Sequence, residues 1–222
     1  FSVIAKDAAG NTDTTPPSYT WIITTDKPTV TLTTAATSPT NAAFTVTANF
    51  TKSVTGLEEG EITVTNGKAS SLSGSGSSYT FTVTPTTDGP VTVQIPANKA
   101  QDSAGNGNSA SDPLSVTYDH TAPNTTITSN PTNPSNSDSA VFNFISNETP
   151  STFECQIDSK EWVPCTSPTS YSSLPDGSHT FSVIAKDAAG NTDTTPPSYT
   201  WIITTDKPTV TLTTAATSPT NA

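Results

Sequence analysis

Hydrophobic and polar residues alternate along most of this chain in short runs. Each run has the period of two that places successive side chains on opposite faces of a β-strand, and Gly, Pro, Asn, Asp or Ser bounds each one. No stretch keeps the 3.6-residue period of an amphipathic helix. We therefore expect an all-β protein built as sandwiches. The predicted strands are 29–33, 44–50, 62–65, 79–83, 91–95, 125–128, 141–145, 153–157, 180–185 and 199–203.

The first 42 residues reappear without a single change as residues 181–222, so the sequence repeats with a period of 180. Repetition at a fixed period is typical of an array of structural units. Copying lengthens a stalk or fibre, whereas it brings a catalytic domain nothing. The chain also starts and stops out of phase with its repeat, so we expect it to be a window from a longer array.

Two different modules make up one period. Both open with a proline-led strand, at residues 27–32 and 122–127, and both carry a late Asp-Ala/Ser-Ala-Gly-Asn segment, at 102–106 and 187–191. We place the modules at 27–120 and 121–206. Residues 1–26 are then expected to be the last two strands of a preceding second-type module, and residues 207–222 the first strand of a following first-type module.

The charge excludes one class of partner. The chain has 19 Asp and Glu, eight Lys and no Arg, and its formal charge is −11. Nucleic-acid binding requires basic patches and Arg forks, so we expect no nucleic-acid partner. One period, residues 27–206, contains 16 acidic residues and six Lys, which gives −10 for every repeat added. Such an array repels itself, stays soluble and attracts cations.

No targeting, lipidation or membrane-spanning segment is apparent, so no membrane contact is expected in this segment.

Cys155 and Cys165 are the only cysteines. The residues between them predict a tight hairpin with its turn at 158–161, and cysteines that face each other near the base of a hairpin can form a disulfide. Two cysteines with no histidine nearby cannot make a closed zinc site. A disulfide implies an oxidising compartment outside the cytoplasm.

Two resemblances cover the chain. Residues 27–120, with PTVTLTT, FTVTANFTKSVTGLEEGEITVTNG and VTVQIPANKAQDSAGNGNSAS, resemble a bacterial Ig-like domain. Residues 121–206, with FECQIDSKEWVPC and DGSHTFSVIAKDAAGNTD, resemble a second Ig-like or fibronectin-III-like bacterial repeat. The resemblance implies tandem Ig-like β-sandwiches of two alternating types, in a large extracellular or surface protein of bacteria. It says much less about activity.

We therefore expect a structural extender in the stalk or fibre of an adhesin-type protein, whose neighbours are other modules of the same chain. One alternative is a filament in which identical chains pack laterally or exchange strands. Another is a carbohydrate- or host-binding module, for which Trp162 is the candidate contact. No catalytic set assembles, so no enzyme is expected. His120, His179 and a flexible turn at 74–77 are expected to be exposed, and Trp201, Phe142 and Phe181 to lie in a core.

Carboxylates form the one candidate site. The resemblance implies that the loops headed by Asp102 and Asp187 point toward the preceding module, where calcium often stiffens the joints of large bacterial adhesins. Calcium requires six to eight oxygen ligands. The alternative is that these residues cap their own loops through Asx turns. The calcium candidates are Asp88, Asp119, Asp187, Asn191 and Asp193 at one joint, and Asp26 and Asp102, with Glu58 or Glu59, at the other.

Overall fold

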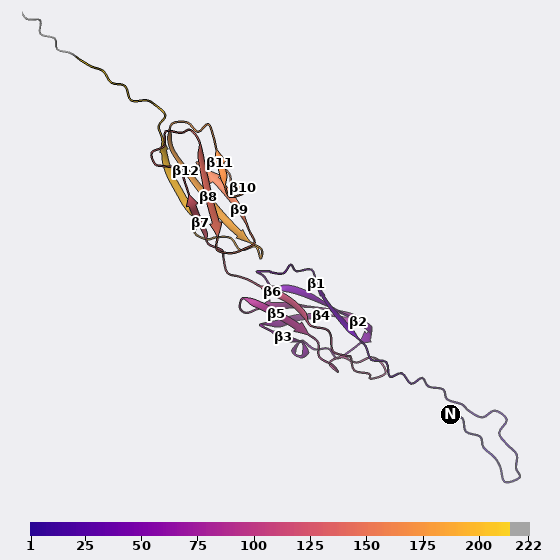
Figure 1. Ribbon diagram of the computed structural model, residues 1–222. Coiled ribbons are helices and arrows are strands. Elements are labelled where there is room, and N and C mark those ends of the chain that lie inside the picture. Colours follow the sequence, from indigo (N-terminus) through magenta and orange to yellow (C-terminus); the bar gives the residue numbers. More distant parts are fainter. Residues whose placement is uncertain (214–222) are drawn as a thin grey trace, which may run out of the picture. The chain divides into compact units, whose positions relative to one another are not determined.

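The computed structural model describes residues 1–213 of the chain (Figure 1). Almost every regular element of that part is a β-strand, and the one helical segment in it is a 3-10 turn, η1 (Glu59–Glu61). The all-β fold class is confirmed. The chain divides into two compact units, residues 1–119 and 120–222. No helix among the described residues is long and apolar enough to cross a membrane.

The first unit contains two three-stranded antiparallel sheets. Its alternating strands bury one face, as in β2, where every second residue from Phe44 to Phe50 is buried. These faces form a single core in which Val46, Phe81 and Val93 are almost completely buried. One sheet has the order β1-β2-β4, with β1 (Val30–Thr34), β2 (Phe44–Val54) and β4 (Gly67–Pro85). The other has the order β3-β5-β6, with β3 (Thr63–Thr65), β5 (Gly89–Gln94) and β6 (Leu114–Tyr118).

The second unit is also a sandwich, with a core of its own built largely from aromatic rings. Phe142 stacks on Phe181 with ring centroids 4.0 Å apart, and Trp201 meets Phe142 edge-on at 5.2 Å. All three are fully buried, which confirms them as core residues. One sheet has the order β10-β9-β12-β13: β10 (Val163–Cys165), β9 (Ser151–Ile157), β12 (Gly177–Asp187), β13 (Ser198–Ile203). The other has the order β11-β8-β7: β11 (Thr169–Tyr171), β8 (Ala140–Ser146), β7 (Thr125–Ser129).

The two units share a way of joining their sheets. In the first unit, Thr40 lies after β1 in the chain and makes a parallel bridge to Tyr118 on β6, which belongs to the opposite sheet. In the second, Ser135 follows β7 and makes a parallel bridge to Ile203 on β13, again in the opposite sheet. The chain after the first strand of each unit therefore changes sheets and pairs with the last strand.

Each of the ten strands predicted from patterning overlaps an observed one, and the structure adds β6, β10 and β11. The two strands expected in residues 1–26 are not formed as strands, since that segment has only isolated bridges, Ser2 to Ser18 and Lys6 to Thr12. The turn expected at residues 74–77 lies within the bounds of β4. The chain nevertheless bends back on itself at Gly74, which lies against the backbone of Ser78 and Tyr79. Gly74 has φ +106°, and a Cβ on it would lie 2.4 Å from the carbonyl oxygen of Ser78. Residues 207–213 form no strand, and the rest of the strand predicted at 207–222 lies outside the described residues.

Candidate functional site

Asp7, Asp102 and Asp187 each head a loop of the same design. Asp102 and Asp187 are two of the predicted calcium ligands. Oδ1 of Asp187, the last residue of β12, accepts hydrogen bonds from the backbone N–H groups of Gly190 at 2.7 Å and Asn191 at 2.8 Å. Oδ2 accepts a third from the Asn191 side-chain amide at 2.8 Å. Gly190 takes φ +98°, a left-handed conformation that glycine adopts without a steric penalty. Asp187 thus caps its own loop, as Asx-turn residues do.

Asp102 in the first unit makes a similar loop. Its Oδ1 accepts hydrogen bonds from the backbone N–H groups of Ala104 at 3.0 Å and Asn106 at 2.9 Å. The side-chain amide of Asn106 is the largest cause of a lowered pKa at Asp102; burial opposes it, and Lys52 adds to the lowering. The carboxylate is therefore stabilised in its charged form by its own loop.

A lysine contacts two members of the calcium group predicted before module 27–120, Asp26 and Asp102. The Lys52 Nζ lies 3.5 Å from Oδ2 of the buried Asp102, and it also donates a hydrogen bond to the backbone carbonyl of Asp26. The Asn106 side-chain amide donates to the carbonyl of Thr24 at 3.1 Å. The segment entering the first unit is thus tied to the Asp102 loop by an ammonium group and an amide, both donors.

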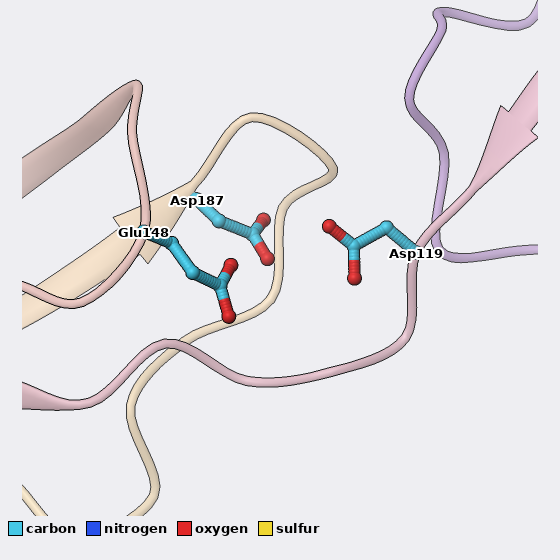
Figure 2. A group of neighbouring side chains, drawn as sticks. All are labelled: Asp119, Glu148 and Asp187. Carbon is cyan, nitrogen blue, oxygen red and sulfur yellow. The ribbon is translucent and has the colours of Figure 1, made fainter. Parts of the chain in front are cut away.

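In the second unit, Asp187 has a carboxylate neighbour that the sequence analysis missed. Glu148 lies in the loop between β8 and β9, and oxygens of the two carboxylates lie within 4.8 Å of each other (Figure 2). The register explains the meeting: Ser151, at the start of β9, pairs with Asp187, at the end of β12. The sequence predicts β8, β9 and β12 but not the register between β9 and β12, and this register is what places Glu148 beside Asp187. Asp119, also labelled in Figure 2, is the last residue of the first unit.

Asp193 is buried and links the loop after β12 to β7. Its Oδ2 accepts a 2.7 Å hydrogen bond from the backbone N–H of Thr125, and its Oδ1 accepts one of 2.8 Å from the N–H of Thr195. Burial raises the pKa of Asp193, but hydrogen bonds from the Thr125 side chain and from these two N–H groups outweigh it and the pKa is lowered. Asp88 lies in the turn between β4 and β5. Calcium binding by this set of residues stays a prediction.

The predicted disulfide is confirmed. Cys155 on β9 and Cys165 on β10 are bonded, with Cα atoms 5.8 Å apart. Cys155 pairs across the ladder with Val163, and Cys165 with Phe153. The cysteines are therefore diagonal neighbours, not directly opposite as expected, and their bond fastens the edge strand β10 to the rest of its sheet.

The two histidines expected to be exposed differ in outcome, since His120 is exposed and His179 is not. His179 is buried against Trp201, with ring centroids 5.6 Å apart, so its expected exposure is wrong. Its position in β12, where every second residue turns inward, is the reason. Trp162, the candidate carbohydrate contact, is 37% exposed. It follows Lys160 and Glu161, which line an apolar hollow of about 330 Å³ beside the disulfide. Carbohydrate binding there stays a prediction.

The sequence of residues 24–118 matches the family described as the bacterial Ig-like domain. The matched segment lies within the first unit and is similar to bacterial Ig-like domains. Solved structures similar to this chain include the fibronectin(III)-like modules of CbhA from Clostridium thermocellum, which are 16% identical in sequence with a TM-score of 0.40. That match covers 78% of this chain and 93% of the CbhA chain. A putative membrane anchored protein from Corynebacterium diphtheriae is 14% identical with a TM-score of 0.29, covering 80% and 53%. No curated protein matches the chain.

Proposed function

We propose that this chain is a structural spacer in a large extracellular protein of bacteria, of the adhesin-stalk or fibre type. The observation that carries the proposal is the unchanged recurrence of 42 residues at a period of 180. Selection for length retains identical copies, because each copy adds the same increment. The bacterial Ig-like domain within the period is a scaffold on which such a role can be built.

The separate cores support this role. Val46, Phe81 and Val93 belong to one hydrophobic cluster, whereas Phe142 and Trp201 belong to another. Each unit buries its apolar face without help from the other. Units of this kind can be added to a chain without redesign of their neighbours, as in other repeat proteins.

Charge and redox chemistry support a location outside the cytoplasm. Each period adds a formal charge of −10, so neighbouring copies repel one another and the array stays soluble. The Cys155–Cys165 disulfide persists in secreted and surface compartments and is rare in the cytosol. Both features suit a protein that works in the external medium.

The surroundings of His179 favour a structural role over a catalytic one. Both of its ring nitrogens lie within hydrogen-bonding distance of acceptors, the carboxylate of Asp158 and the carbonyl of Pro175. A general base needs a free nitrogen facing a hydroxyl or a water. His179 therefore holds the sandwich together, and we propose no reaction for it.

Small-angle X-ray scattering on arrays of one, two and three periods tests the spacer role. Strands of about eight to ten residues at about 3.3 Å per residue, plus loops, give each sandwich a length of about 30–40 Å. The maximum dimension should therefore grow by a constant step of about 60–80 Å per period. An array that folds back, so that the third period adds no length, would contradict the proposal.

The location has its own test. Antibodies raised against residues 27–206 should label intact cells of the bacterium that makes the protein. Labelling only after the cells are permeabilised would contradict the extracellular location, whatever the scattering result.

A further inference from the structure

The segment between the two cysteines closes in a tight turn of uncommon backbone conformation. Asp158 and Ser159 directly follow β9 and have φ values of 52° and 57°, in the left-handed region that residues with a Cβ rarely adopt. The Lys160 N–H donates to the carbonyl of Ile157 at 3.0 Å, and the Gln156 side-chain amide donates to the carbonyl of Lys160 at 2.7 Å. The turn therefore keeps this conformation while the two arms of the hairpin stay together.

The disulfide is the covalent fastening between those arms. β10 has three residues and is an edge strand that pairs with β9. Its middle residue is Pro164, which has no N–H group to donate to a ladder. The bond between Cys155 and Cys165 crosses this short ladder. Without the bond, a ladder of three residue pairs alone would hold β10 in place.

The turn carries the charged groups that act on His179. Oδ2 of Asp158 faces Nδ1 of the imidazole, and the ammonium group of Lys160 also acts on the ring. From the other elements around the ring, the described residues contribute neutral groups, the carbonyl of Pro175 ahead of β12 and the indole of Trp201 on β13. Both charges that act on this histidine thus lie between the two cysteines in sequence.

We propose that the disulfide and the His179–Asp158 pair form one redox-sensitive device, in which breaking the disulfide lets the turn relax and removes Asp158 from His179. Relaxation relieves the two left-handed residues, and the Asp158 carboxylate exchanges its contacts with His179 and with the N–H of Thr180 for water. The sandwich stays folded, because the stacked rings of its core lie on β8, β12 and β13. This device goes beyond the spacer role and does not depend on it.

A small dithiol such as dithiothreitol supplies the reduction. One of its thiolates attacks a sulfur of the protein disulfide, and its second thiol then resolves the mixed disulfide. The dithiol is oxidised to a cyclic disulfide. Its two electrons and two protons end on the thiols of Cys155 and Cys165.

The coupling acts in both directions, as linkage requires. The Pro175 carbonyl is the largest cause of the raised pKa of His179 and stays in place, whereas Asp158, which raises the pKa further against burial and Lys160, is lost on reduction. The reduced chain should therefore bind the histidine proton less tightly. By the same free energy, a protonated His179 favours the oxidised hairpin.

The test uses the full chain, whose only histidines are His120 and His179. NMR titration of the imidazole resonances, before and after reduction by dithiothreitol, follows each ring separately. We expect reduction to lower the pKa of His179 toward the value that the oxidised Asp158→Asn chain gives. The titration of His120, which lies outside the hairpin, should be the same in both states.

An equal pKa of His179 in the oxidised and reduced chains would overturn the proposal. Unfolding of the second unit on reduction would also overturn it, because the turn must open within a folded sandwich. The resonances of the buried rings of Phe142 and Trp201 report whether the sandwich is intact.

The redox equilibrium with dithiothreitol gives a second readout. Between about pH 5 and pH 9, across the range where histidine titrates, His179 should make reduction less favourable on the acid side by about tenfold for each unit of pKa that reduction removes. His179→Gln should abolish this part of the pH dependence, and His120→Gln should leave it. Identical pH dependence in the unaltered and His179→Gln chains would show that the disulfide and the histidine are not coupled.

Discussion

Nδ1 of His179 lies 2.7 Å from Oδ2 of Asp158. Nε2 of the same ring lies 2.8 Å from the carbonyl oxygen of Pro175. Since both partners are acceptors, the imidazole satisfies both only when it carries a proton on each nitrogen. The Pro175 carbonyl is the largest cause of a raised pKa at His179; burial opposes it, Asp158 raises the pKa further, and Lys160 lowers it. This histidine and aspartate form an ion pair at the base of β12.

The pair predicts a loss of stability at higher pH. An unfolded chain has a histidine pKa of about 6.5, and the folded protein holds the proton more tightly. The contribution to the free energy of unfolding is therefore complete below about pH 6.5 and is lost as the pH rises through the raised pKa. Burial raises the pKa of Asp158, but hydrogen bonds from His179 and Thr180 outweigh it and lower the pKa. Its own contribution is lost only as the pH falls below the usual value of 3.8.

The measurement is the melting temperature of the second unit between about pH 5 and pH 9, across the range where histidine titrates. His179→Gln should flatten the decline seen above about pH 6.5. His120→Gln, at the other histidine, should leave the decline as it is. Equal slopes in all three chains would show that the pair does not govern stability.

Asp193 and its copy Asp13 offer a matched comparison. Both accept a 2.8 Å hydrogen bond from the threonine two residues on, but Asp193 also accepts one from the buried N–H of Thr125. Asp193→Ala leaves that donor without its partner, so we expect a loss of about 1–3 kcal/mol from the free energy of unfolding. Asp13→Ala should change it by less than about 0.5 kcal/mol. Urea unfolding followed by tryptophan emission measures the free energy of unfolding of both variants. Equal losses in Asp193→Ala and Asp13→Ala would contradict the role given to the hydrogen bond from Thr125.

Calcium at the carboxylates is tested best at Glu148. Asp187→Asn alters a carboxylate that also caps its loop, so a loss of stability there is ambiguous. If the carboxylates bind calcium, the ion should raise the melting temperature, EDTA should reverse the rise, and Glu148→Gln should remove the rise. Asp7→Asn, at the copy of Asp187 near the N-terminus, is the control. Identical melting curves in calcium and in EDTA would leave the aspartates with loop capping alone.

Removing the disulfide should weaken one unit only. Cys155→Ala with Cys165→Ala opens a cross-link ten residues apart in sequence, for which the chain-entropy account gives a loss of about 2–3 kcal/mol. The cores of the two units are separate, so the melting of the first unit should not move. Differential scanning calorimetry of the full chain resolves the two transitions. A downward shift of both would contradict the independence of the units.

Period-two patterning predicts the strands that bury one face well, such as β2 and β12, because alternation reports burial directly. It misses β10 and β11, three-residue strands whose pairing depends on neighbours distant in sequence. At residues 74–77 glycine and serine do mark a bend of the chain, although these residues fall within the bounds of β4.

At the site, the loop-capping aspartates follow from their local spacing. Glu148 and the burial of His179 do not, because each depends on strand register. Sequence spacing carries no information on which residue of β9 lies opposite Asp187, and that pairing is what brings Glu148 to it.

The cross-link between β9 and β10 also sets how far the second unit can lengthen when the chain is pulled. The ten residue steps from Cys155 to Cys165 would span about 33–36 Å when fully extended, whereas the bonded cysteines hold their Cα atoms 5.8 Å apart. About 30 Å of contour is thus withheld from each unfolded second unit while the disulfide is intact. The extension that a tethered array reaches under force therefore depends on the redox state of the surrounding medium.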